Sequence, residues 1–330
     1  GIEFGSTNIK AVLIGEENEV LASGSYRWVS SFENGYFTYS LDEVVSGLQA
    51  AYGAMKQEVQ EKYGTVLSKI GCIGISAMMH GYLAFDAQDH LLVPFRTWQN
   101  TTTAKAAAEL SELFSFNIPE RWSVSHLYQA VLDEEPHVAQ LHKITTLAGY
   151  VHYLLTGKNV LGVGDASGMF PVESDRPQYD AGMMELLRET LRGKGISWDP
   201  ADLFPEILVA GEVAGSLTAD GAKLLDPAGD LEPGTVFCPP EGDAGTGMTA
   251  TNSVRENTGN VSAGTSIFSM VVLDKPLKDY YKEIDVVATP VGKPVAMVHC
   301  NNCTSDINAW VNIFKEYQEL MGMPVDMNEI

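Results

Sequence analysis

The first 27 residues alternate between apolar and polar positions in short runs that are typical of β-strands. Apolar side chains recur in residues 1–4 and 9–14, and a Gly5-Ser-Thr-Asn8 turn separates the two runs. A third run, residues 19–27, follows a turn at residues 15–18. Consecutive strands joined by short turns predict a β-meander. They do not predict the strand–turn–helix unit that carries the common Gly-rich nucleotide motifs.

The pattern then changes to helical spacing. Apolar residues between positions 41 and 59 recur three or four apart, after a capping box formed by Ser40 and Glu43, and Gly64 is predicted to end the helix. Three further helices are predicted, at residues 104–114, at residues 147–155 and from Asp306 onward. The apolar stripe of the last helix, which contains Trp310 and Phe314, is predicted to be buried core.

The remaining apolar runs predict strands. These are residues 70–76, a hairpin of 82–85 with 91–95, and residues 235–238, 260–272, 285–289 and 295–299. Residues 172–235 are rich in Pro, Gly and Asp and are predicted to be helix and loop that pack without carrying chemistry. A length of 330 residues predicts two domains.

Composition narrows the functional classes. The chain has 21 Lys and Arg against 43 Asp and Glu, a net charge of −22, which disfavours nucleic acids and anionic membrane surfaces as partners. No apolar run reaches membrane-spanning length and no signal peptide opens the chain, so a cytoplasmic protein is expected. The expected partners are therefore a small-molecule substrate and, in a homodimer, a second copy of the chain.

Four cysteines are too few and too scattered for a disulfide framework. Cys300-Asn-Asn-Cys303 is a single C-x-x-C without a second pair at zinc spacing. Both residues are therefore expected to be small buried side chains rather than a redox or metal site.

Glu241-Gly-Asp243-Ala-Gly is the strongest candidate for chemistry. Glycines on either side allow a tight turn and close approach of a ligand, and a carboxylate held there is a candidate general base. Two other interpretations are open: Asp243 caps its own turn, or Glu241 and Asp243 form the paired carboxylates of a glycosidase. The two-residue spacing argues against the pair if the segment is extended.

Two turns share one local design. Gly5-Ser-Thr-Asn8 and Ser262-Ala-Gly-Thr-Ser266 each combine glycine and hydroxyl residues between two predicted strands. Backbone N–H groups and hydroxyls in such turns bind anions. One turn per domain would allow a polyphosphate to be held from both sides.

These segments together resemble the FGGY family of carbohydrate kinases. The resemblance rests on six segments in family order: residues 1–12, Ile75-Ser-Ala-Met-Met-His-Gly81, Trp98-Gln-Asn100, Gly164-Asp-Ala-Ser-Gly168, Gly242-Asp243-Ala and Gly259-Asn-Val-Ser-Ala-Gly-Thr-Ser266. The Met-His-Gly segment is similar to that of xylulokinases. The resemblance implies an actin-like (ribonuclease H-like) α/β fold with mixed sheets, flanking helices and two domains around a cleft. The domains would be residues 1–245 and the beginning of a second, incomplete domain at 246–330.

The same resemblance implies an ATP- and Mg²⁺-dependent sugar kinase, most plausibly for a ketopentose such as xylulose. By matching position, Asp243 is the base and also contacts the sugar, together with Met79, His80, Trp98 and Asn100. The phosphate contacts would be Ser6, Thr7, Asn8, Lys10, Gly264, Thr265 and Ser266, and Glu3 would hold Mg²⁺ through water.

The chain also departs from the family pattern. Glu3 stands where the family usually has Asp, which moves the carboxylate by about 1.5 Å, and Thr101 replaces a charged residue. The chain ends soon after its last helix, before the segment that binds adenosine in the family. Two alternatives therefore stay open: an actin-like nucleotide-binding or assembly protein, and a relative that binds a sugar without turnover.

Overall fold

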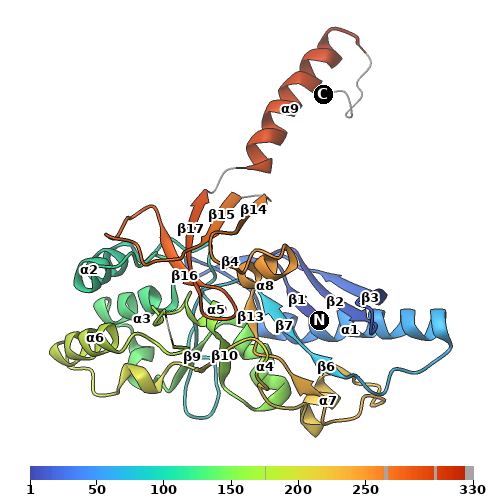
Figure 1. The fold of residues 1–330 in the computed structure, drawn as a ribbon, viewed down its shortest axis with the longest axis horizontal. Helices are drawn as coiled ribbons and strands as arrows, with labels where there is room; N and C mark the ends of the chain where they lie inside the picture. Colours follow the sequence, from blue (N-terminus) through green and yellow to red (C-terminus); the bar gives the residue numbers. More distant parts are fainter. Residues whose placement is uncertain (175, 264–266, 301–302, 324–330) are drawn as a thin grey trace.

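The larger of the two main sheets is a five-stranded mixed sheet (Figure 1). A computed structural model describes residues 1–174, 176–263, 267–300 and 303–323. The order of the sheet is β13-β7-β1-β2-β3, with bounds Glu241–Gly242, Ile75–Ala77, Ile2–Phe4, Asn8–Ile14 and Val20–Arg27. β1, β2 and β3 pair antiparallel in sequence order, which confirms the predicted meander. β7 pairs in parallel with both β1 and β13, so the first strand and the Asp243 segment end at the same edge of one sheet.

Helix α1, Leu41–Tyr63, covers this sheet and buries its apolar residues as predicted. Its packing against β3 is so close that a Cβ on Gly24 would lie 2.1 Å from the Ala51 carbonyl oxygen. Gly64 ends the helix in the left-handed conformation. The prediction of a capping box is wrong in one respect. Ser40 occupies the N-cap position, but its side chain makes no capping hydrogen bond.

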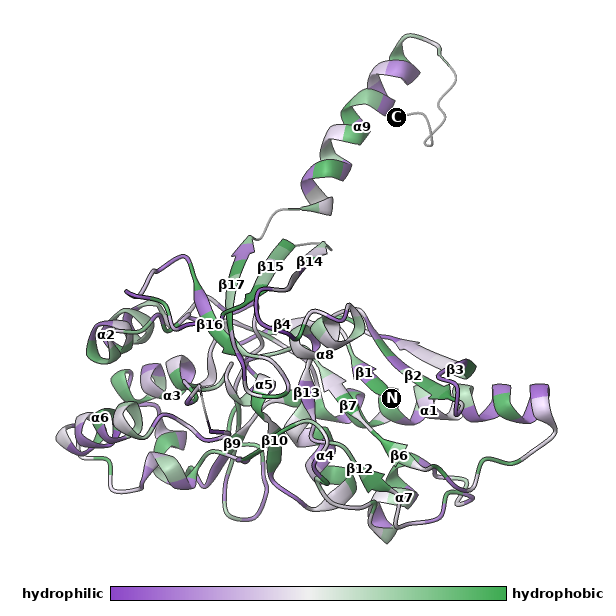
Figure 2. Ribbon diagram, viewed as in Figure 1, coloured by the Kyte–Doolittle hydropathy of each residue, from purple (hydrophilic) through white to green (hydrophobic). Residues whose placement is uncertain are grey.

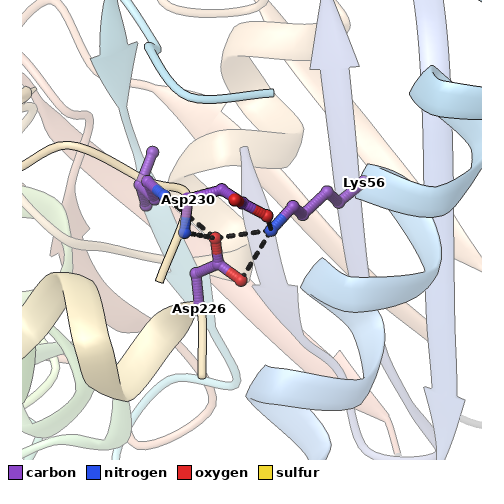
Figure 3. Close-up of polar contacts among 4 residues, drawn as sticks. Lys56, Asp226 and Asp230 are labelled. Carbon is purple, nitrogen blue, oxygen red and sulfur yellow. Dashed lines mark hydrogen bonds and ion pairs between the residues drawn. The ribbon is translucent and has the colours of Figure 1, made fainter. Parts of the chain in front are cut away.

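An ion pair fixes α1 to the C-terminal end of helix α7, Ala219–Leu225 (Figure 3). Lys56 Nζ donates to Asp226 Oδ2 at 2.6 Å and to Asp230 Oδ2 at 2.7 Å. Asp226 Oδ2 also accepts the amides of Asp230 and Leu231, so the carboxylate organises its own loop. Only 14% of the Lys56 side chain and 4% of the Asp226 side chain are exposed, so this pair is largely shielded from solvent.

A layer of helices lies beside the five-stranded sheet (Figure 1). Its helices are α2 Ala104–Phe114, α3 Ser123–Leu132, η1 Pro136–Gln140, α5 Val163–Ala166, α6 Ala181–Gly193 and η2 Pro200–Asp202. Helix α4, Leu147–Thr156, packs instead in the hydrophobic cluster of the five-stranded sheet and α1. Short strands connect them: β4 Ser31–Glu33 with β5 Tyr36–Thr38, β6 Cys72–Ile73 with β12 Val236–Phe237, β8 Leu83–Phe85 with β9 Lys143–Thr145, and β10 Val160–Gly162 with β11 Glu206–Leu208. The helices predicted at 104–114 and 147–155 are thus confirmed.

One local prediction is wrong. The run at residues 70–76 is two strands, β6 and β7, which belong to different sheets, because tertiary pairing decided what a short apolar run would do. The hairpin of 82–85 with 91–95 is confirmed by antiparallel bridges and by the two backbone hydrogen bonds between Tyr82 and Arg96. β8 also pairs with β9, which was not predicted.

A second, antiparallel sheet has the order β14-β15-β17-β16, with bounds Gly259–Ala263, Ile267–Val272, Pro294–Cys300 and Asp285–Ala288. These strands confirm the predictions for that region. Residues on its inner face, among them Met270, Val287 and Val295, pack in one hydrophobic cluster with helices α3 and α5. The second sheet therefore packs on the helical layer.

The last helix, α9, Thr304–Leu320, extends away from the rest of the molecule (Figure 1). Figure 2 shows hydrophobic residues along this helix, and their side chains are solvent-exposed. Trp310 is 65% and Phe314 55% exposed. The prediction that this stripe is buried is wrong for the described residues, since no other described element covers it.

The expected boundary at residue 245 falls inside helix α8, Asp243–Ala250, which joins the two sheets. No helix among the described residues is long and apolar enough to cross a membrane.

Candidate active site

A cavity of about 460 Å³ lies where the two sheets meet. Residues from both sheets and from the loops between them line it: Glu3, Ser6, Met78, Met79, His80, Trp98, Arg121, Asp243, Ala244, Gly247, Ser262, Phe268, Met297 and His299. Six side chains predicted as site residues thus share one space, namely Glu3, Ser6, Met79, His80, Trp98 and Asp243.

Asp243 is the first residue of α8, at the end of β13. Its Oδ1 accepts the amides of Met79 at 3.3 Å and of Ala244 at 2.9 Å. The side chain is accessible from the cavity, yet protein surrounds it closely enough that loss of hydration raises the pKa of Asp243 to about 6. The Glu3 carboxylate raises this pKa further, and the two amides oppose both effects. Most Asp243 side chains are therefore ionised at pH 7, while the pKa stays close to the working range of a base.

The glycine before the aspartate makes room for the pocket. A Cβ on Gly242 would lie 2.1 Å from Met79 Cγ, so only glycine lets these segments approach. Met79 is 5% exposed and its amide holds Asp243. The Met79 segment and the Asp243 segment thus fix each other, as neighbouring parallel strands β7 and β13 require.

Glu241 has a structural role. It is 6% exposed, and its carboxylate accepts the amides of Gly164 at 3.2 Å and Asp165 at 2.9 Å. Burial raises the pKa of Glu241 to about 8 and that of Asp165 to about 7. Because Glu241 does not line the cavity, the structure argues against a paired-carboxylate site with Asp243.

His80 is held in one orientation. Its Nδ1 donates to the Gly168 carbonyl at 3.1 Å, and the ring stacks on Trp122 at 6.4 Å. Burial lowers the pKa of His80 well below its usual value, so the ring is neutral and its Nε2 is an acceptor. The backbone φ of 68° at His80 is left-handed, an uncommon state for a residue with a side chain. The Gly164–Gly168 segment therefore acts by supporting His80.

Trp98 and Asn100 differ in whether their side chains reach the cavity. Trp98 lines the cavity. Asn100 is 3% exposed, its Oδ1 accepts the Phe37 amide at 2.8 Å, and its Nδ2 donates to the Phe37 carbonyl at 2.9 Å. Asn100 does not line the cavity. Its amide group is engaged in holding β5 in place.

The Gly5–Asn8 turn is held by its carbonyl groups. Trp28 Nε1 donates to the Gly5 carbonyl and the Tyr39 hydroxyl to the Ser6 carbonyl, both at 2.7 Å. Within the part of the chain that the structure describes, the amides of Ser6 and Thr7 have no backbone acceptor. Asn8 Nδ2 donates to Thr7 Oγ1 at 3.0 Å. The turn therefore presents backbone N–H groups that can donate hydrogen bonds to an anion.

Glu3 and Lys10 face each other across β1 and β2, with Lys10 Nζ 3.2 Å from Glu3 Oε2. Both side chains are about half exposed, at 43% for Glu3 and 53% for Lys10. Lys10 thus contacts Glu3, which lines the cavity, but Lys10 itself does not line it.

The second turn lies between β14 and β15, and Ser262 of β14 lines the cavity. Gly264, Thr265 and Ser266, which were predicted to bind phosphate, lie outside the described residues.

Sequence reasoning did not identify the wall formed by Arg121 and His299. Arg121 pairs with Asp285, which also accepts from Asn117 Nδ2 at 2.8 Å. Burial lowers the pKa of His299, and the Arg121 charge lowers it further. Arg121 belongs to a loop before α3 and His299 to β17, and neither stands in a motif, so only the fold brings them together.

No group of three or more His, Cys, Asp or Glu side chains in the described segments is arranged to hold a metal ion alone. Glu3 and Asp243 are, however, two carboxylates that line one cavity. Mg²⁺ in phosphate-transferring sites is commonly held by one or two carboxylates plus waters and phosphate oxygens. The residues therefore fit a magnesium ion that arrives with a phosphate ligand.

Known proteins resemble both parts of the chain. Residues 1–228 match the N-terminal domain, and residues 259–323 the C-terminal domain, of the FGGY family of carbohydrate kinases. The chain is 23% identical over 274 residues to the xylulose kinase of Escherichia coli (strain K12), which covers 81% of this chain and 52% of that protein.

Two solved structures show the same fold at 17% identity. One is the xylulose kinase from Lactobacillus acidophilus, with a TM-score of 0.78 over 93% of this chain and 61% of that one. The other is the gluconate kinase from Lactobacillus acidophilus, with a TM-score of 0.77 over 93% of this chain and 60% of that one. The chain thus spans roughly half to two thirds of the length of these relatives.

Proposed function

From the premise that this chain belongs to the FGGY family of carbohydrate kinases, we propose that it transfers the γ-phosphate of ATP to a sugar hydroxyl. Its fold is the α/β actin-like fold of that family, as the sequence predicted. One observation carries the proposal. A single cavity places Asp243 beside Met79 and His80 and also beside Ser6 and Ser262 of the two hairpins.

Asp243 is the proposed general base. Its carboxylate is fixed by the amides of Met79 and Ala244, so one oxygen is held while the other can accept a proton. As the sugar oxygen attacks the γ-phosphorus, its proton passes to Asp243, and the bond from the γ-phosphorus to the bridging oxygen of ADP breaks. Phosphoryl transfer depends mainly on positioning and on charge stabilisation, which a fixed carboxylate supports.

Met79, His80 and Trp98 form the proposed sugar side of the cavity. The neutral His80 ring offers an acceptor to a sugar hydroxyl, and an aromatic ring such as that of Trp98 packs well against the apolar face of a sugar. Asn100, which was predicted to bind the sugar, is proposed here to shape the rim through its bonds to Phe37.

The two hairpins form the proposed phosphate side. Ser6 and Thr7 present amides, and Asn8 and Lys10 follow on β2. Gly264, Thr265 and Ser266, which lie outside the described residues, stay proposed phosphate contacts on the basis of the sequence. Glu3, with Asp243, would hold Mg²⁺, mostly through water. When bound, the ion supplies positive charge to the phosphate oxygens.

A ketopentose such as xylulose is the proposed sugar. The similarity to the Escherichia coli xylulose kinase supports it. The fold likeness to a gluconate kinase and the Arg121 guanidinium in the cavity wall make a sugar acid the second candidate. Arg121 is already paired with Asp285, which favours a neutral sugar.

The test is ATP consumption with xylulose, other pentuloses, hexuloses, polyols and gluconate, for the wild-type chain and Asp243→Asn. Removing a general base typically costs about 10²- to 10⁴-fold in rate, so kcat should fall by about 10³-fold. Binding of the sugar, measured by calorimetry, should change less than tenfold, because the amide keeps the shape of the carboxylate.

Asp220→Asn is the matched control, since Asp220 lies in the first turn of α7, away from the cavity. Its kcat should equal that of the wild type. Equal turnover in Asp243→Asn and wild type would refute the base assignment. Sugar binding without ATP consumption in the wild type would instead favour a non-catalytic sugar-binding protein.

A further inference from the structure

Cys72 and Cys238 lie side by side on strands that are far apart in the sequence. β6 pairs in parallel with β12, with Cys72 opposite Val236, and the Cys238 amide donates to the Ile73 carbonyl at 2.9 Å. Side chains alternate along a strand, so Ile73 and Phe237 point into the core while both cysteines lie on the exposed face. The two Sγ atoms are 3.3 Å apart.

We propose that Cys72 and Cys238 are a redox-active pair that closes to a reversible disulfide in reaction with low-molecular-weight disulfides such as oxidised glutathione. A disulfide bond is about 2.0 Å long, so the sulfur atoms must approach from 3.3 Å. The pairing of β6 with β12 and the hydrogen bond from the Cys238 amide to the Ile73 carbonyl hold the two backbones together as the sulfur atoms approach. Solvent exposure of both thiols gives the oxidant access.

The reaction proceeds by two exchanges. One cysteine thiolate attacks a sulfur of the oxidant, which forms a mixed disulfide and releases one small thiol. The second cysteine, as thiolate, attacks the protein sulfur of that mixed disulfide, forms the Cys72–Cys238 bond and releases the second small thiol. The protein loses two electrons and two protons, and the oxidant gains both.

Either cysteine can make the first attack, because both thiols are exposed. The other cysteine then resolves the mixed disulfide. Partial burial and the hydrogen bond with Cys72 raise the pKa of Cys238 to about 11, which disfavours its thiolate while Cys72 remains a thiol.

The bond would join the roots of the two segments that form the active site. Cys238 precedes Asp243 by the short connection Pro239-Pro240-Glu241-Gly242, and Cys72 precedes β7, which leads to Met79. Neither cysteine lines the cavity, and the bond closes a loop between positions 166 residues apart. Cross-links over long loops restrict the unfolded chain, so the oxidised protein should melt at a higher temperature.

The other two cysteines provide the control background. Cys300 is exposed and Cys303 half-buried, so the expectation that both are buried is wrong. Residues 301–302 between them lie outside the described part of the chain. In the Cys300→Ser/Cys303→Ser double variant, only the proposed pair remains to react.

The test treats this double variant with oxidised glutathione, blocks free thiols with iodoacetamide, and measures the intact mass and the peptide map without reduction. The expected product has lost two hydrogens, carries no glutathione, and contains a cross-linked peptide pair that dithiothreitol separates. Its melting temperature should exceed that of the reduced form.

Single variants in the same background show whether each cysteine resolves the other. Cys238→Ser should retain one stable glutathione on Cys72, and Cys72→Ser should retain one on Cys238, because no resolving thiol remains in either variant. Glutathione on both cysteines of the intact pair would overturn the proposal. So would two thiols that remain free under conditions in which Cys238→Ser reacts.

Discussion

At the scale of the residue, the environment of Asp243 predicts how activity depends on pH. Its pKa is raised from 3.8 to about 6, first by loss of hydration and also by the Glu3 carboxylate. Only the ionised form can accept the sugar proton. We therefore expect kcat/KM to rise about tenfold per pH unit below pH 6 and to level off near pH 7.

Glu3→Gln offers a direct check on this assignment. It removes the negative charge that raises the pKa of Asp243, so the midpoint of the pH profile should move to lower pH. The absolute rate should fall as well, since Glu3 is proposed to hold Mg²⁺, but only the midpoint is diagnostic. A midpoint that stays at the wild-type pH would mean that another group controls the profile.

Residues in one motif proved to have different environments. In Trp98-Gln-Asn100, Trp98 lines the cavity while Asn100 is buried and engaged by the backbone of Phe37. In Glu241-Gly-Asp243, the second acid faces the cavity while the first binds the amides of Gly164 and Asp165. A motif identifies the segment, and burial then separates its contacting residues from its supporting ones.

At the scale of the element, the Lys56–Asp226 pair should hold α1 against α7. Lys56→Met keeps the length and packing of the side chain but leaves the nearly buried Asp226 carboxylate without its cation. We expect the free energy of unfolding to fall by about 2 kcal/mol, measured by urea denaturation with circular dichroism.

Lys69→Met is the control for this prediction. Its partner Glu232 is 3.4 Å away, and the two side chains are 77% and 56% exposed, so solvent screens the pair. The change in unfolding free energy should stay within about 0.5 kcal/mol. Equal losses in both variants would mean that the Lys56 pair contributes no more than a surface ion pair.

The element around Asp243 differs from its sequence-based interpretation in one instructive way. Glycines on both sides suggested a turn, but residues 243–250 form helix α8. The backbone N–H groups at the beginning of a helix have no intrahelical acceptor and donate favourably to a carboxylate. Asp243 is thus held by a helix terminus as well as by the Met79 amide.

At the scale of the whole molecule, the exposed face of α9 should govern self-association. Leu320 is 87% and Trp310 65% exposed, and apolar surface of this kind promotes contact between molecules. Trp310→Gln/Phe314→Gln should lower the sedimentation-velocity fraction above monomer at high protein concentration. The melting temperature should not change measurably, because these side chains support none of the described core.

Ser23, which pairs with Val12 in the meander, is the control position because it is not part of the α9 surface. The Ser23→Gln variant should show the same sedimentation profile as the wild type. If the α9 variant and the wild type associate equally, the α9 face does not drive association.

The sequence by itself determined the meander, helices α1, α2 and α4, the strands of the second sheet and the family to which the chain belongs. Strong local signals explain this: periodic apolar residues, glycine stops, and turns rich in glycine and hydroxyls. Only the tertiary structure decided that β8 pairs with β9, that α9 lies uncovered, and that Arg121 and His299 complete the cavity. The pairing of Cys72 with Cys238 belongs to this second group. These features join positions far apart in the chain, and no local pattern encodes which distant partner a side chain will meet.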